Sequence, residues 1–218
     1  GQTFYSCCCQ KICTACHDKC SEYDERCPLC RAPCPATEAD LMNRYQKQAA
    51  KGNAEAQMHL GDAYRGGRHS LQKNLKRAVE LYKQAAAQGH AQAQNKLGCC
   101  YETGVGVKID YKTAKQSFQR AADQGHPGAQ CNLGKMFYHG WGVAQSYDEA
   151  VRLFRLAAAE GYPEALHNLG DCYAGGHGVP QDCDEALCLF KRAAANGHAG
   201  AAEKAAEISL RLAARASG

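Results

Sequence analysis

Cysteine is the residue type whose number and spacing in this chain could do chemistry. Nine of the 15 cysteines fall within the first 34 residues. Two pairs there, Cys13 with Cys16 and Cys27 with Cys30, have the C-x-x-C spacing that offers two thiolates to one tetrahedral zinc ion, at about 2.3 Å. Such a cluster holds either disulfides in an oxidising compartment or a metal in a reducing one. Because so short a segment cannot build a core, a bound metal would supply its folding free energy.

A disulfide-linked, secreted protein is the alternative interpretation. C-x-x-C pairs make poor structural bridges, and an odd number of cysteines fits secretion badly. We find no signal peptide and no apolar run near the roughly 18–20 residues of a membrane span, although the chain starts at Gly1 and an upstream segment could carry a targeting signal. We therefore expect Zn2+ as the cofactor and the cytoplasm or nucleus as the compartment.

The chain after the cysteine-rich segment is a repeat with a period of 36 or 37 residues. This repeat would position the cysteine cluster and bind any partner. Each unit contains a Leu-Gly pair, an aromatic residue three positions later, and two alanines followed by a glycine near its end. Three of the four units also share a Gly-x-Gly-Val turn. The Leu-Gly pairs are Leu60-Gly61, Leu97-Gly98, Leu133-Gly134 and Leu169-Gly170.

Each unit has the pattern of two helices joined by a turn. In the first unit Ala56, Leu60 and Tyr64 lie four apart on one helical face, and a second apolar stripe starts at Ala78 with i, i+3, i+4, i+7 and i+8 spacing. One such hairpin cannot bury its own apolar face, so stacked neighbours must complete the core. We expect an all-α, α/α solenoid of helix-turn-helix repeats over residues 41–218, after a zinc-binding module over 1–36. The sequence at 67–70 departs from Gly-x-Gly-Val, which predicts a less regular first turn.

The repeat resembles the Sel1-like repeat family, whose members are relatives of the tetratricopeptide repeat. The resemblance covers four full units, about residues 54–198, preceded by a half-unit and followed by a capping helix at about 199–215. It implies a right-handed solenoid and the role of a scaffold or adaptor that binds a protein partner.

The cysteine-rich segment resembles the later part of a RING-type zinc finger. Its sequence follows the pattern Cys-Cys-Gly-Lys-x-Ile-Cys-x-x-Cys and ends Cys-Pro-x-Cys-Arg, except that Cys9 and Gln10 replace the glycine and lysine. The resemblance implies six zinc ligands in an interleaved, two-site arrangement whose first ligand pair is missing from this chain. The six ligands are Cys7, Cys8, Cys13, Cys16, Cys27 and Cys30.

Only one of the two implied sites is complete. The complete site combines the first and last of the three cysteine pairs. The middle pair supplies only two ligands of the other site, which stays incomplete unless Cys9, His17 or Cys20 completes it. The alternative is one ribbon-like site made by the two C-x-x-C pairs, although their ten-residue spacer is shorter than the usual 15–20 residues.

The RING resemblance implies a ubiquitin-conjugating enzyme as a partner. Pro28 and Leu29 would form the hydrophobic contact, and Arg31 would hold the ubiquitin thioester in a reactive pose. Such catalysis acts by positioning and needs no catalytic nucleophile. Alternatively, Arg31 only offsets the negative charge of the thiolates. The expected function is a RING-type, ubiquitin-ligase-like adaptor, and the rival is a non-enzymatic repeat scaffold with a structural zinc module.

A partner surface is expected on first-helix positions that differ between repeats while the core positions do not. Trp141, between two turn glycines, is either an aromatic anchor for the partner or a ring packed over a neighbouring repeat. The other candidates are Met58, Asp62, Arg65, Asn95, Cys99, Glu102, Cys131, Lys135 and Tyr138.

Other functions find little support in the sequence. The net charge of +4 has no concentrated basic stripe, so nucleic-acid binding is not expected. His90, His126 and His198 recur one repeat apart, too far for one metal, and are expected to be loop or cap residues. The six cysteines of the repeats are expected to be buried apolar residues or free thiols.

Overall fold

The computed structural model of the chain describes residues 4–5, 11–12, 38–68 and 71–216. It divides into two compact units, residues 1–109 (unit 1) and 110–218 (unit 2), which are described separately below. This division separates the two helices of the second repeat. The expected boundary between a 1–36 module and a 41–218 solenoid falls mostly on residues outside the described ones, and it stays a prediction.

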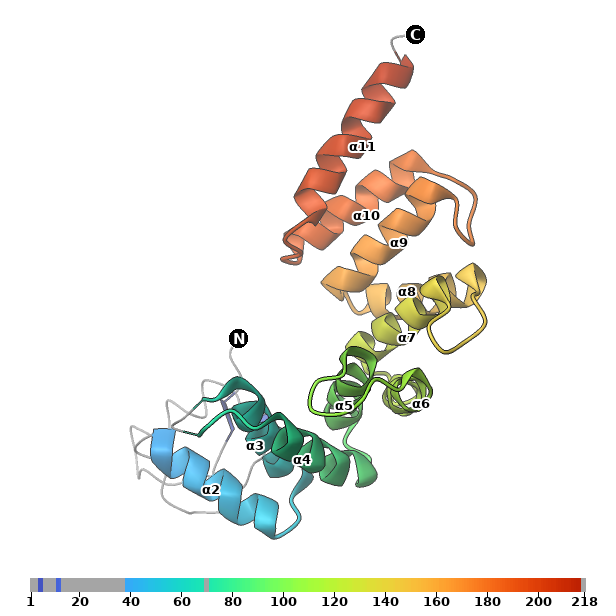
Figure 1. The fold of residues 1–218 in the computed structure, drawn as a ribbon. Helices are drawn as coiled ribbons and strands as arrows, with labels where there is room; N and C mark the ends of the chain where they lie inside the picture. The colour runs from blue at the N-terminus through green and yellow to red at the C-terminus, as the bar shows by residue number, and fades with distance from the viewer. Residues whose placement is uncertain (1–3, 6–10, 13–37, 69–70, 217–218) are drawn as a thin grey trace. The chain divides into compact units, whose positions relative to one another are not determined.

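Helices make up nearly all of the described chain (Figure 1). Two short strands, β1 (Phe4–Tyr5) and β2 (Lys11–Ile12), pair antiparallel near the start. The helices of unit 1 are α2 (Glu38–Ala50), α3 (Ala54–Gly66), α4 (Leu75–Ala87) and α5 (Ala91–Thr103). Those of unit 2 are α6 (Tyr111–Ala122), α7 (Pro127–His139), α8 (Tyr147–Ala159), α9 (Pro163–Gly175), α10 (Cys183–Ala195) and α11 (Ala201–Ala216).

The helices form antiparallel pairs, as α7 with α8 and α9 with α10 show in Figure 1. In the third repeat a hydrogen bond closes the hairpin where the second helix begins: the N–H of Ser146 donates to the carbonyl of Phe137 at 2.9 Å. The equivalent bond joins Asn74 to Tyr64 at 2.9 Å, so the first repeat closes like the third despite its different turn sequence. Residues 69–70 of that turn lie outside the described residues.

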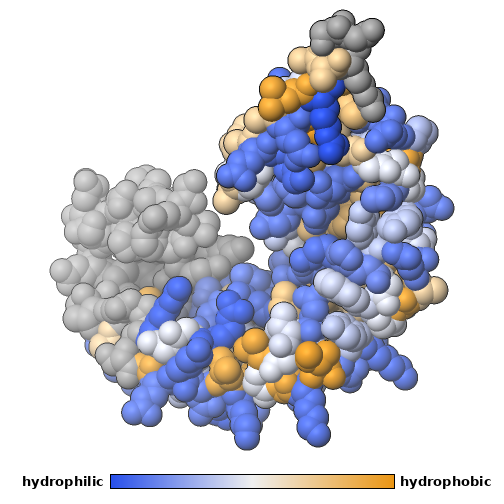
Figure 2. Space-filling view, turned by 45° about the horizontal axis from the view of Figure 1, so that its top comes forward, coloured by the Kyte–Doolittle hydropathy of each residue, from blue (hydrophilic) through white to orange (hydrophobic). Residues whose placement is uncertain are grey.

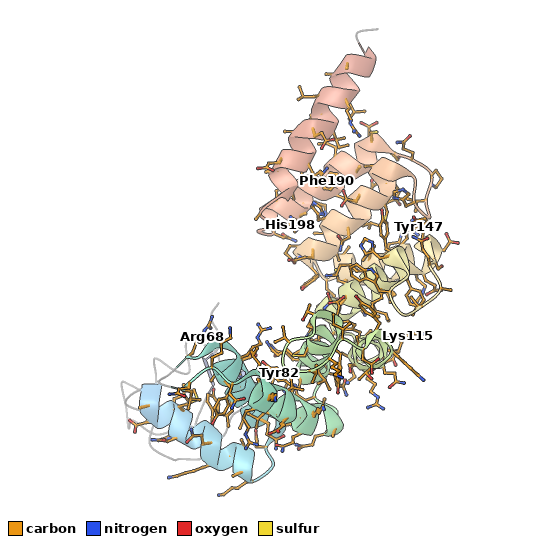
Figure 3. The ribbon with its side chains drawn as sticks, in the orientation of Figure 1. Arg68, Tyr82, Lys115, Tyr147, Phe190 and His198 are labelled. Atoms are coloured by element: carbon orange, nitrogen blue, oxygen red, sulfur yellow. The ribbon has the colours of Figure 1, made fainter. Side chains whose placement is uncertain are left out.

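The Leu-Gly pair packs the two helices of a repeat against each other. The four leucines are 1–8% exposed, as expected. A Cβ at Gly134 would lie 2.6 Å from Cε1 of Phe154, and glycine therefore allows the buried ring of the second helix to contact the first. Tyr82 and Phe190 occupy the same place in their own repeats (Figure 3). These contacts confirm an all-helical solenoid of repeats, while its handedness stays a prediction.

Candidate interaction surface

The predicted zinc and ubiquitin residues all fall in the N-terminal segment. Cys7, Cys8, Cys13, Cys16, Cys27, Cys30, Pro28, Leu29 and Arg31 lie outside the described residues. Within the described part of the chain, no group of three or more His, Cys, Asp or Glu side chains could hold a metal ion. Nor is any described helix long and apolar enough to cross a membrane.

Two residues assigned to the partner surface are buried, and that assignment is wrong. Met58 is 0% exposed and packs in the core of unit 1 with Tyr82 and Leu97. Cys131 is 1% exposed, and its Sγ lies 3.4 Å from Nδ2 of Asn168. Both side chains fill the seam between neighbouring helices, so neither is available to a partner.

Other candidates in unit 1 are engaged within the fold. Asp62 accepts a 2.6 Å hydrogen bond from the hydroxyl of Tyr82 and forms a 3.1 Å ion pair with Lys96. Burial and this carboxylate raise the pKa of Tyr82 above its usual range. Arg65 is exposed, whereas Asn95, Cys99 and Glu102 are half-buried. Unit 1 therefore offers few free groups along the predicted stripe.

The same stripe opens into a cleft in unit 2. We call it the α7–α9 cleft, and it encloses about 300 Å³. Helix α7 contributes the two predicted residues Lys135 and Tyr138, and α9 contributes Asn168 and Asp171. The remaining lining residues are His139, Phe154 and His177.

Six stacked or edge-on rings continue from this cleft along unit 2, and we call them the aromatic ladder. Its members are Tyr111, His139, Trp141, Tyr138, Tyr147 and His177. The ring centroids of His139 and Trp141 lie 4.4 Å apart, and the hydroxyl of Tyr138 lies 2.7 Å from Nδ1 of His177.

The repeat geometry explains this ladder. His177 occupies the Gly-x-Gly turn and stacks on Tyr147, the first residue of the preceding repeat's second helix, with centroids 5.0 Å apart (Tyr147 is labelled in Figure 3). Trp141 stacks on Tyr111 in the same way, at 6.3 Å, and is still 38% exposed. The ring of Trp141 therefore packs over a neighbouring repeat, as one of the two interpretations predicts, while its role as an anchor for a partner stays a prediction.

Burial changes the acid–base properties of side chains in and beside the cleft. Burial raises the pKa of Tyr138 and of Asp171, although His167 lies 3.3 Å from the latter carboxylate. Burial also raises the pKa of Cys131 to about 11 and that of Cys172 to about 12. Both sulfurs are therefore thiols at neutral pH.

The variable stripe predicted from the sequence covers three repeats and ends at Tyr138, so it includes only Lys135 and Tyr138 of the seven lining residues. Asp171 lies 36 residues after Lys135, so carrying the stripe into the fourth repeat would have found it. His177 similarly occupies the turn position of Trp141.

The recurring histidines lie at helix starts and ends, as expected. Nδ1 of His90 and Nδ1 of His126 each accept a hydrogen bond from the third residue of the next helix. His198 instead lies in the loop before α11 and stacks on the ring of His167 in α9, with centroids 4.2 Å apart, outside the cleft. Burial raises the pKa of Glu55, but its hydrogen bonds with His59 (3.1 Å) and His90 (2.7 Å) outweigh burial and hold the pKa well below its usual range. The six repeat cysteines form no disulfide, and Cys188 is the most exposed of them.

Hydrophilic side chains cover most of the visible face of the described residues, and apolar ones form small separate patches (Figure 2). The larger exposed apolar side chains are Ile109, Trp141, Leu156 and Leu210. A partner of this surface would therefore meet mixed polar and aromatic groups.

Comparison with known proteins identifies the repeat. The family model of the Sel1 repeat matches residues 54–90, 91–126, 127–162 and 163–198. A Sel1 repeat protein from Oxalobacter formigenes is 37% identical, with a TM-score of 0.74 over 78% of this chain and 67% of that one. The c5321 protective antigen of uropathogenic Escherichia coli, which displays an SLR fold, is 36% identical, with a TM-score of 0.68.

That second match covers 73% of this chain but only 34% of the antigen. The immunity protein Pa5087 from Pseudomonas aeruginosa shares the fold at 22% identity, with a TM-score of 0.56 over 86% of this chain and 67% of that one. No curated protein sequence matches the chain.

Proposed function

Because the chain belongs to the Sel1 repeat proteins, we propose that it is a scaffold that binds a protein partner, with the α7–α9 cleft as the binding site. The aromatic ladder is the observation that carries this proposal. Its rings are held by stacking before any partner arrives, so binding costs little side-chain entropy. Aromatic anchors of this kind dominate the binding energy of protein interfaces.

The size and lining of the cleft indicate what part of a partner enters it. About 300 Å³ is at the lower end of ligand pockets, enough for one or two side chains of a partner. Lys135 lies on α7, and Asn168 and Asp171 lie on α9, so the cleft presents charges of both signs and an amide. Such a lining can pair with main-chain groups and charges of an extended segment.

Site-specific photocrosslinking tests the proposal. We would replace Tyr138 with p-benzoylphenylalanine in the full chain and use Leu156, which is 46% exposed on α8 outside the cleft, as the matched control position. A protein crosslinked from Tyr138 and not from Leu156 is expected. Lys135→Ala with Asp171→Ala should then weaken the binding of that protein. Equal crosslinking from both positions would reject the cleft as the binding site.

We further propose, from cysteine spacing alone, that the N-terminal segment binds zinc. Paired thiolates suit this metal, which would hold together a segment too short to fold by itself. Cys7, Cys8, Cys27 and Cys30 would form the complete site in the RING arrangement. Elemental analysis should find zinc bound to the purified chain, and Cys27→Ser should reduce its content. A zinc-free chain with intact helicity would refute the proposal.

The finer proposal is a RING-type, ubiquitin-ligase-like adaptor in the cytoplasm or nucleus, where the thiols would stay reduced. Its test uses a form of the protein that retains the first ligand pair of the RING pattern. Arg31→Ala should leave zinc content and helicity unchanged but lower ubiquitin transfer from a conjugating enzyme, because the arginine would order the thioester and not hold the fold. Transfer that is absent, or unaffected by the substitution, would leave the alternative of a non-enzymatic scaffold with a structural zinc module.

A further inference from the structure

A shallow groove recurs where the second helix of one repeat begins against the turn of the next repeat. In unit 1 it lies between the start of α4 and the turn that contains Gly106, and in unit 2 between α6 and Gly142. The two grooves enclose about 590 and 570 Å³. The turn approaches closely in both: a Cβ at Gly106 would lie 2.5 Å from the carbonyl oxygen of Leu75, and one at Gly142 would lie 2.5 Å from Cβ of Tyr111.

Both grooves are lined by cations and by no carboxylate, and we call them the basic grooves. Their cationic lining is Lys73, Lys76 and Lys108 in unit 1, and Lys112, Lys115 and Arg120 in unit 2. None of these six side chains forms a salt bridge within the described residues. Asp110, close to Lys112 in the chain, is engaged as the N-cap of α6 through two hydrogen bonds from Thr113.

Helix stability does not explain these charges. The first turns of α4 and α6 contain no acidic residue and carry Lys76 and Lys112, at the end of a helix that disfavours positive charge. At the same place α8 carries Asp148 and Glu149, and α10 is acidic as well. Because lysines in these first turns oppose helix stability, their presence points to a role in binding.

We propose that the two basic grooves bind extended acidic segments, rich in aspartate and glutamate, of a partner protein. Charge complementarity selects such a segment and speeds its encounter. Lys115 is already restrained, since its Nζ lies 5.8 Å from the ring centroid of Phe137 (Lys115 is labelled in Figure 3). The lining glutamine Gln116 can contact the segment's main chain, whereas Nε2 of Gln119 donates a 2.8 Å hydrogen bond to Asp123. Three cations in each groove are too few for the basic stripe of a nucleic-acid-binding protein.

The spacing of the cations fits a strand. Lys112 and Arg120 are eight residues apart on one face of α6, which is about 12 Å along a helix. An extended peptide advances about 3.3 Å per residue, so acidic side chains four residues apart lie about 13 Å apart and on the same side. Glutamates four residues apart in an extended peptide therefore match the spacing of Lys112 and Arg120.

Calorimetry with the full chain and a synthetic (Glu-Gly)₆ peptide at low salt tests the proposal. We expect two peptides per chain. The double variant Lys112→Gln with Arg120→Gln should bind one peptide per chain, and so should Lys73→Gln with Lys76→Gln. The variant that combines all four substitutions should bind the peptide at least tenfold more weakly. Lys191→Gln with Arg192→Gln removes the same charge from exposed positions of α10 and is the matched control, which should keep both sites.

Other outcomes would overturn the proposal. These are an equal loss of binding in the control variant, equal binding of a (Gln-Gly)₆ peptide, or preferential binding of oligouridylate, which would assign the grooves to nucleic acid. The substituted side chains in the three double variants are exposed, and unchanged helicity by circular dichroism verifies that each variant is folded. The site is separate from the α7–α9 cleft, so Tyr138→Ala should leave peptide binding unchanged.

Discussion

Alanine at Gly142 should destabilise unit 2 more than alanine at Gly125. Both glycines have a left-handed backbone, with φ of 66° at Gly142 and 79° at Gly125. They differ in the space around them. A Cβ at Gly142 would lie 2.5 Å from Cβ and 3.2 Å from the carbonyl carbon of Tyr111, whereas nothing lies within 4 Å of a Cβ at Gly125. Comparing the two substitutions therefore isolates the contact between repeats.

The expected magnitudes follow from these two terms. A left-handed alanine costs about 1–2 kcal/mol at either position. Gly142→Ala must also displace the turn or the half-buried Tyr111, and overpacking of this kind costs about 1–3 kcal/mol more. Gly142→Ala should thus lower the free energy of unfolding by about 2–5 kcal/mol and Gly125→Ala by about 1–2 kcal/mol.

Urea denaturation followed by circular dichroism would measure both values, with an unchanged slope showing that only stability has changed. Trp141, the single tryptophan, adds a local signal, since its ring stacks on Tyr111 and its fluorescence should shift in Gly142→Ala alone. An equal loss of stability in the two variants would contradict this prediction, because it would show that the turn makes no close steric contact with the preceding repeat.

Three further predictions test burial and charge. Leu133→Ala should cost about 2–5 kcal/mol in urea denaturation, because this leucine is 1% exposed in the core of unit 2. Glu55 has a lowered pKa in the folded chain, so its stabilisation is complete above about pH 4.3 and is lost as the pH falls below it; the stability difference between wild type and Glu55→Gln should shrink over that range. A disulfide reagent at pH 8 should modify exposed Cys188 quickly and buried Cys131 only after unfolding.

The sequence by itself determined the repeat and its helices. Leu-Gly pairs, aromatic positions and closing glycines act within one unit, so their spacing predicts each hairpin and the burial of the four leucines. The cap role of His90 and His126 could be predicted for the same reason, since a cap contacts its own helix. The cysteine pairs give a prediction of zinc that concerns residues outside the described ones.

Only the tertiary structure decided which of the positions that vary between repeats are exposed to solvent. A helix inside a solenoid packs against its partner helix and against the neighbouring repeats, so variability does not mean exposure: Met58 and Cys131 vary between repeats and are still buried. The aromatic ladder and the basic grooves likewise depend on where a turn contacts the repeat before it, as Trp141 contacts Tyr111. Such contacts join residues about 30 positions apart, and local periodicity carries no information about their distance.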